Sequence, residues 1–144
     1  AQMVKEGFGV GGITADGGVQ IAPAPCLALV DPNNRNMYAG NATNWSGRRW
    51  ASGMPVYTGF NTVLPPNSPA CNADTWDERN QVVPPTSHHP GGVVAALADA
   101  SVRFISETIN AGDPTIVEPR SGPSPYGVWG ALGSKEGGEA SQLE

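Results

Sequence analysis

The stretch from Ser87 to Ile105, SHHPGGVVAALADASVRFI, most constrains what this chain can fold into. A Pro-Gly-Gly breaker precedes a short apolar run, and Asp99-Ala100-Ser101 separates that run from a second one, Val102-Arg103-Phe104-Ile105. Two short apolar runs joined by a turn predict a β-hairpin over about residues 92–105. Because both alternating sets of side chains in the first run are apolar, we expect both faces of the hairpin to be covered, which would make it central in the sheet.

Glycine and proline set the character of the rest of the chain. They account for 19 and 14 of the 144 residues, whereas only 15% of residues are charged. Both residues interrupt helices, so the composition disfavours a helical bundle and favours short strands joined by long loops. The length is that of one domain. We expect a single α+β domain over residues 1–144 that is mainly β, with a small antiparallel sheet, long Gly/Pro-rich loops, and flexible ends at residues 1–18 and 134–144.

Two other segments carry patterns of regular structure. In residues 54–66 apolar side chains alternate with small or polar ones, which predicts a strand. One face of that strand would carry Val56, Phe60 and Leu64. Near the other end of the chain, the apolar run Tyr126–Leu132 fits one helical turn.

The charge balance limits the class of partner. The net charge is −5 and only eight residues are Lys or Arg, so the chain offers no extended basic face for a phosphate backbone, and we expect no nucleic acid partner. No stretch has the length of a membrane-spanning helix, and no signal peptide opens the sequence. Because the first residue is Ala1 rather than Met, we expect a processed chain or a part of a longer protein.

Cys26 and Cys71 are the only cysteines, and each lies in Pro-rich loop sequence. A disulfide between them would contribute roughly 3–4 kcal/mol in the chain-entropy model. The alternative is two unrelated free thiols. The even count, the loop settings and the lack of a Cys-x-x-Cys motif favour the disulfide and an oxidising compartment. The segment Cys26–Val30 fits either a strand or a single helical turn.

The segment NATNWSGRRW holds the candidate binding residues, because Trp45 and Trp50 flank Arg48 and Arg49. One interpretation is structural: an arginine stacks on an indole at the surface of a small β domain. The other is a platform of these four side chains for a sugar or an anion. We favour the structural interpretation and keep the platform as the candidate binding site.

Neither the histidines nor the acidic residues form a recognisable metal motif. His88 and His89 are adjacent, and adjacent residues on a strand point to opposite faces, so the pair is poorly placed to chelate one ion. Asp74, Asp77 and Glu78 lack the alternating acidic spacing and central glycine of an EF-hand loop. We therefore expect no metal and no cofactor.

A Ser/His/Asp set can be assembled from Ser87 or Ser101 with His89 and Asp99. No nucleophile elbow accompanies it, so we predict no catalytic residues. We interpret His89 and Asp99 instead as a structural clasp that fixes the ends of the hairpin, a role that needs only hydrogen-bond reach.

Three motifs occur in order along the chain: FNTVLPPNSPAC, SHHPGGVVAALADASVRFISETI and YGVWGALGSKEGGE. This order resembles the C-terminal half of a large planctomycete family of unknown function, whose members begin with a prepilin-type cleavage and methylation helix and are sometimes labelled as solute-binding. The family has a His and an Asp-Gly separated by nine residues, and His89 and Asp99 keep that spacing. Two positions depart from the family, because Val94 replaces an Asn and Ala100 replaces the Gly of the turn.

The resemblance implies the C-terminal globular part of a pilin- or pseudopilin-like precursor. Such a chain would be a non-enzymatic, extracytoplasmic structural protein of the cell surface or of a secretion or pilus-like assembly. Its partners would be other protein subunits, and its only link to a membrane would be the helix that precedes this part of the family. The alternative is an extracellular module that binds a glycan or another small solute.

Overall fold

Short strands and short helices make up the regular structure of residues 2–13, 22–135 and 137–138, which a computed structural model describes. These residues form eight strands, three α-helices and one 3-10 helix, and the longest helix has seven residues. The fold is therefore α+β and mainly β, as the sequence predicts. Within the described ranges, no helix combines the length and the apolar character that crossing a membrane requires.

A four-stranded sheet lies at the centre of the fold, in the order β4-β1-β5-β6. Its strands are β1 (Phe8–Val10), β4 (Ala42–Thr43), β5 (Ala70–Asn72) and β6 (Gln81–Val82). The pairs β1–β4 and β5–β6 are antiparallel, but β1 and β5 are parallel. The predicted small antiparallel sheet is present except in the pair β1–β5, which is parallel because a long connection returns the chain to the end of the sheet at which β1 starts.

Strand β1 lies within residues 1–18, the N-terminal end that we expected to be flexible. Phe8 is only 2% exposed and packs with Val56 and Tyr57. A Cβ atom on Gly9 would lie 2.7 Å from the side chain of Leu29, so this glycine permits close packing rather than motion. Residues 14–18 of the predicted flexible N-terminal end, and 136 and 139–144 of the C-terminal one, lie outside the described residues.

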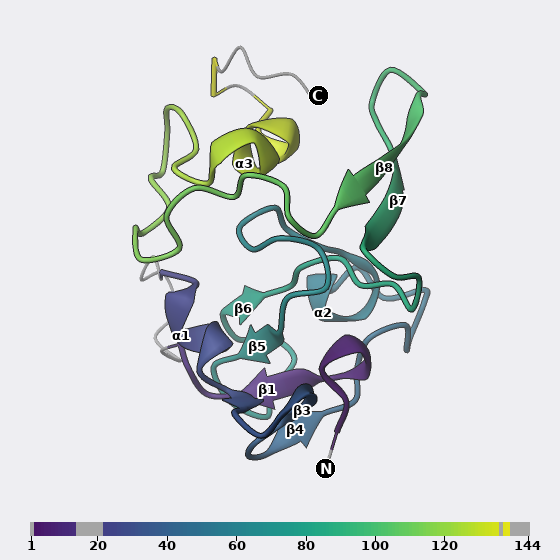
Figure 1. Cartoon of the computed structure of the whole chain (residues 1–144), viewed down its shortest axis with the longest axis vertical. Helices are drawn as coiled ribbons and strands as arrows, with labels where there is room; N and C mark the ends of the chain where they lie inside the picture. The colour runs from purple at the N-terminus through teal and green to yellow at the C-terminus, as the bar shows by residue number, and fades with distance from the viewer. Residues whose placement is uncertain (1, 14–21, 136, 139–144) are drawn as a thin grey trace.

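Short elements surround the sheet (Figure 1). They are the 3-10 helix η1 (Val4–Glu6), α1 (Ala24–Leu27), the antiparallel pair β2 (Val30–Asp31) and β3 (Asn34–Tyr38), and α2 (Pro55–Thr58). The segment Cys26–Val30 thus completes a helical turn and then enters a strand. Residues 54–66 do not form the predicted strand, because Pro55 begins a helical turn in which the amide of Gly59 donates to the Pro55 carbonyl over 2.9 Å.

The hairpin forms as predicted, from β7 (Gly92–Ala96) and β8 (Val102–Ser106) in antiparallel register. It is not central, since β7 and β8 pair only with each other among the described strands, and the hairpin projects from the body of the domain (Figure 1). One face, with Val93 and Ile105, is buried. On the other face Val94 and Val102 are each 67% exposed and Phe104 is 57% exposed. The expectation of two covered faces is therefore wrong.

Helix α3 (Gly127–Gly133) forms where the apolar run Tyr126–Leu132 predicts a helical turn. Its Trp129 is 3% exposed and packs with Val93 and Ile105, so this helix covers the buried face of the hairpin. The indole Nε1 of Trp129 donates to the carbonyl oxygen of Leu64 over 2.8 Å. Trp129 thus ties the hairpin to the main body of the domain.

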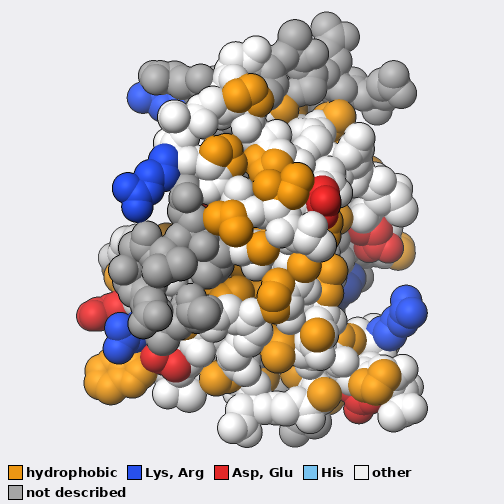
Figure 2. All heavy atoms as spheres, turned by 90° about the vertical axis from the view of Figure 1, so that its left-hand side faces the viewer, with side chains coloured by type: hydrophobic (Ala, Val, Ile, Leu, Met, Phe, Trp, Pro, Cys, Tyr) orange, Lys and Arg blue, Asp and Glu red, His pale blue; other side chains and the backbone are white. Residues whose placement is uncertain are grey.

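Apolar side chains are exposed outside the hairpin as well. On the side of α1, hydrophobic side chains form a band that runs from top to bottom of the molecule, and most charged side chains lie beside it (Figure 2). The exposed fractions of Leu27, Ile116 and Val117 are 44%, 45% and 43%, below the values of the exposed hairpin residues. The hairpin therefore carries the more strongly exposed aliphatic side chains.

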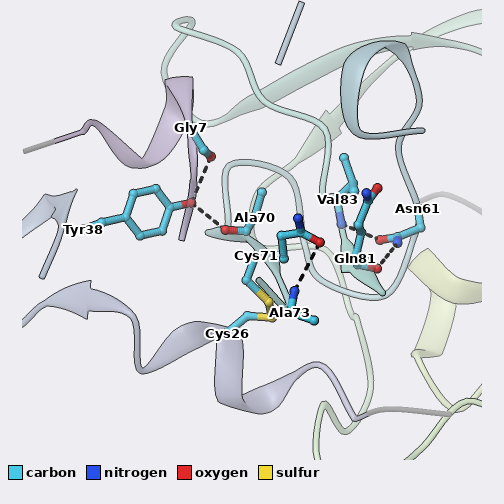
Figure 3. The surroundings of a disulfide bond; sticks show 10 residues. Gly7, Cys26, Tyr38, Asn61, Ala70, Cys71, Ala73, Gln81 and Val83 are labelled. Atoms are coloured by element: carbon cyan, nitrogen blue, oxygen red, sulfur yellow. Dashed lines mark hydrogen bonds between the residues drawn. A yellow bond between two sulfur atoms is a disulfide. The ribbon is translucent and has the colours of Figure 1, made fainter. Parts of the chain in front are cut away.

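The predicted disulfide between Cys26 and Cys71 is present and joins α1 to β5 (Figure 3). Both cysteines have 0% exposure and belong to a buried cluster with Leu64, Val82 and Tyr126. The two free thiols that the sequence left open are thereby ruled out. The disulfide lies inside this buried cluster, where it links α1 to β5 across 45 residues of sequence.

Candidate functional site

The four residues of the predicted platform have different surroundings. Trp45 is partly buried, and its ring centroid lies 6.5 Å from that of Phe8 in the core. Trp50 is 86% exposed. Trp45 is thus a packing residue, and Trp50 is the member of the pair whose ring faces solvent.

Arg49 is engaged by other side chains. Its Nη1 lies 3.3 Å from Oδ2 of Asp77, and its guanidinium carbon lies 5.1 Å from the ring centroid of Tyr57. The predicted stacking of an arginine on an aromatic ring therefore occurs, but on a phenol rather than on an indole. Arg48, by contrast, is exposed, and its backbone amide donates to the carbonyl oxygen of Trp45 over 3.0 Å.

Tyr57 connects this pair to α2. Its hydroxyl donates to Oδ2 of Asp77 over 2.5 Å, and this bond raises the pKa of the phenol, because the carboxylate holds its proton. Arg49, Tyr57 and Asp77 thus form one hydrogen-bonded unit that joins α2 to the loop after β5. The charge of Arg49 is balanced by Asp77, which leaves it poorly suited to bind an anion.

Beside this unit, a groove of about 400 Å³ runs between α2 and the segment 83–86. We call it the α2 groove. Phe8 and Ala70, from two strands of the central sheet, also line it. Trp50 and Phe60 line the groove as well, and both rings are strongly exposed.

Phe60 was expected on one face of a strand, together with Val56 and Leu64. Those two side chains are buried, but Phe60 is 56% exposed. Its ring stacks on that of Trp129, with the centroids 6.5 Å apart and the planes at 7°. Because the strand is replaced by a helical turn, Phe60 leaves the buried face and becomes part of the wall of the groove.

The polar residues of the groove come from segments that sequence reasoning did not connect. Lys5 Nζ donates to the carbonyl oxygen of Ser87 over 2.6 Å. The hydroxyl of Thr86 donates to the carbonyl of Lys5 over 3.3 Å, and that of Thr58 to the carbonyl of Ser52 over 3.3 Å. Nothing in the local pattern around Lys5 points to Ser87, because the contact spans 82 residues.

The acidic loop is organised by internal bonds. Asp74 Oδ2 lies 3.2 Å from Nε of Arg79, and Oδ1 of Asp74 accepts from the amide of Trp76 over 2.7 Å. Asp77 is occupied by Tyr57 and Arg49, as described above. In the part of the chain that the structure describes, no group of three or more His, Cys, Asp or Glu side chains is placed to hold a metal ion.

His89 precedes β7 and Asp99 follows it, so the length of an extended strand separates the two residues. The amide of His89 donates to Oγ of Ser87 over 3.1 Å, and Oδ1 of Asp99 accepts from the amide of Ser101 over 2.9 Å. The bonds from Ser101 lower the pKa of Asp99, because they favour its carboxylate. Each end of the hairpin is thus held by a local turn bond, instead of by a contact between the two residues or a Ser/His/Asp arrangement.

His88 also has a partner of its own. Its Nε2 lies 3.6 Å from Oε1 of Glu6, and both side chains are well exposed. The two histidines lie in a bend before β7 rather than on a strand. The His88–Glu6 pair lies at the surface, between η1 and the segment that leads into the hairpin.

The comparison with protein families finds one described as a protein of unknown function (DUF1559), whose label, SBP_bac_10, is that of a solute-binding protein; it matches residues 11–112. The match includes the disulfide, α2 and the hairpin, and it ends before α3, so the motif YGVWGALGSKEGGE lies outside it. No curated protein and no solved structure matches the chain. Since the matched residues make up well over half of the sequence, the chain belongs to the DUF1559 family of proteins of unknown function.

Proposed function

We propose that this chain is a non-enzymatic structural subunit of an extracytoplasmic assembly at the cell surface, of the secretion or pilus-like kind, and that neighbouring copies meet through the exposed face of the hairpin. The observation that carries the proposal is the apolar character of that face. In the register of β7 and β8, Val94 lies opposite Phe104 and Ala96 lies opposite Val102. All four side chains are exposed, and none of them is charged.

An exposed apolar sheet face of this kind indicates a contact surface, because leaving it in water forgoes the favourable free energy of burial. Two copies of one apolar face can pack against each other without any charge matching, which suits a contact between identical subunits. Arg103 belongs to the alternate set of side chains, opposite Ala95, and therefore leaves this face free of charge.

Two further observations support the location and the type of assembly. A buried disulfide and the solute-binding label of the family are consistent with an extracytoplasmic protein. The three motifs described above resemble planctomycete proteins that begin with a prepilin-type cleavage and methylation helix. That resemblance favours a pseudopilin-like subunit over a freely diffusing one.

Sedimentation velocity of the oxidised chain over a range of concentrations tests the proposed contact. We expect the wild type to associate as concentration rises. The double variant V94T/V102T keeps β-branched side chains on the strands but makes the face polar, so its association should weaken by about tenfold or more.

Val117→Thr is the matched control, because it makes the same exchange at an exposed valine outside the hairpin. It should associate like the wild type. The proposal fails if the wild-type chain stays monomeric up to millimolar concentration, or if V94T/V102T and V117T behave alike. Circular dichroism of each variant checks that the hairpin variants are folded.

A further inference from the structure

We propose that the α2 groove binds an acidic saccharide, with Trp50 and Phe60 packing against sugar rings and Lys5 pairing with a carboxylate of the sugar. None of the residues that line this site belongs to β7 or β8, so the saccharide proposal can be tested independently of the proposed assembly role. The groove replaces the platform expected from sequence, of which only Trp50 lines it.

The aromatic rings are the first argument. Trp50 is 86% exposed and Phe60 is 56% exposed, although both are large apolar side chains that normally gain from burial. One face of a pyranose ring presents C–H groups that pack on an aromatic ring, while the hydroxyl groups point outward to hydrogen-bond partners. Phe60 is also held in place, because it stacks on Trp129, whose indole is anchored to the carbonyl of Leu64.

The charge of the groove is the second argument. Among the described residues that line it, Lys5 is the one with a formal charge, in a chain whose net charge is −5. The ammonium group has three N–H donors, and the bond to the carbonyl of Ser87 uses one of them. In the described part of the chain, Lys5 takes part in no ion pair, whereas Arg49 is paired with Asp77. Lys5 is therefore the cation available to an anionic ligand.

The hydroxyl groups are the third argument. Thr58 and Thr86 line the groove, and each donates its own proton to a backbone carbonyl. Their oxygen lone pairs are thus left to accept hydrogen bonds, and sugar hydroxyl groups are suitable donors. The volume of about 400 Å³ lies within the range of small-molecule sites.

A peptide is a poorer fit to the same groove. Peptides that add to a sheet need a strand edge with free amide groups. The wall opposite α2 carries Pro84 and Pro85, which have no backbone N–H. The groove thus offers ring faces, hydroxyl oxygens and one cation rather than a template for an extended backbone.

Titration of the oxidised wild-type chain with trigalacturonate, followed by ¹H–¹⁵N NMR, tests the site without any mutation. The fully methyl-esterified trisaccharide is the neutral reference, because it keeps the rings and loses the charge. We expect trigalacturonate to bind about tenfold or more tightly than the ester, with shift changes at groove residues such as Lys5, Thr58 and Thr86. Failure of both sugars to bind at millimolar concentration, or shift changes elsewhere only, overturns the proposal.

Two variants then separate the roles of the residues. Trp50→Ala should weaken both sugars by about tenfold, while Trp76→Ala, at an exposed tryptophan that does not line the groove, should not. Lys5→Met should remove the preference for the acid and leave the ester unaffected. Equal effects of the two tryptophan variants, a preference that survives in Lys5→Met, or stronger binding of a proline-rich peptide than of trigalacturonate would each contradict a saccharide site.

Discussion

The hydroxyl of Tyr38 donates to the carbonyl oxygen of Ala70 over 2.7 Å, and so joins β3 to β5 inside the domain (Figure 3). The same hydroxyl lies 3.1 Å from the carbonyl oxygen of Gly7, just before β1. One buried phenol thus lies at the meeting point of three segments that are far apart in the sequence. The residue after Ala70 is Cys71, so this contact and the disulfide fix adjacent positions of the same strand.

Tyr38→Phe should destabilise the fold without changing its shape. The ring would still fill its place, but the carbonyl oxygen of Ala70 would lose this donor, and that of Gly7 would lose the hydroxyl 3.1 Å away. We expect the free energy of unfolding to fall by about 1–3 kcal/mol, measured by urea denaturation at neutral pH. A change well below that range would mean that water or a neighbouring amide replaces the hydroxyl.

Stability should decline in alkaline solution because of the buried tyrosines. Burial raises the pKa of Tyr126 from the ordinary value of 10.0 to about 12, and burial raises that of Tyr38 further. Between the ordinary and the raised pKa of Tyr126, the unfolded chain releases the phenolic proton and the folded chain keeps it. The contribution to stability is therefore full below pH 10 and is lost as the pH rises towards 12.

The measurement is urea unfolding at about pH 9 and about pH 11. The free energy of unfolding should fall less between these conditions in Tyr126→Phe than in the wild type. Tyr126→Phe also loses the bond of 3.0 Å to the carbonyl of Ile116, so only the pH dependence, not the absolute stability, reports on the pKa. Identical pH slopes for the two proteins would contradict the assignment.

Reduction of the disulfide should cost most of the stability of a domain this small. The two cysteines are 45 residues apart in the sequence, which corresponds to about 4 kcal/mol in the chain-entropy model. The double variant C26A/C71A should therefore unfold at much lower urea concentration than the oxidised wild type, and reductant should shift the wild type but not the variant. The intact mass of the oxidised chain should be two hydrogens below the reduced value.

Ala100→Gly should stabilise the hairpin. Ala100 has a φ of 66°, a left-handed conformation that a residue with a Cβ adopts at a cost. Removing the Cβ should raise the free energy of unfolding by about 1 kcal/mol. Ala98→Gly, in the same exposed turn but without a positive φ, is the control and should be neutral or destabilising, since it adds only freedom to the unfolded chain. Equal effects at the two positions would exclude backbone strain as the cause.

Local patterns predicted the elements whose contacts are local. Residues 92–106 carry both strands of the hairpin and the turn between them, and Tyr126–Leu132 carries the apolar side of α3. The disulfide could be predicted because the chain has only two cysteines, so only one pairing was possible. The hairpin and α3 depend on residues that are neighbours in the sequence, and the disulfide depends on the single possible pairing of two cysteines.

The remaining features depend on contacts that no local pattern carries. The parallel partner of β1 lies beyond residue 69. Gly9 suggests flexibility in the sequence, and only the fold shows that the side chain of Leu29 packs against it. The apolar pattern of β7 could not tell whether a neighbouring layer covers its second face. Lys5 and Phe60 join the candidate site through chain segments that meet only in the folded domain.

The position of β1 also sets the order in which the domain can be completed during synthesis. Strand β1 is made before the strands it pairs with, yet it lies inside the sheet between β4 and β5, and its parallel partner follows only after residue 69. Until β5 has left the ribosome, Phe8 has no complete layer to enter, and the edge of β1 that pairs with β5 lacks its native strand. A chain that stops before residue 72 therefore leaves one edge of β1 open to pairing with other chains. The domain is protected from this form of aggregation only once β5 has been synthesised and has paired with β1.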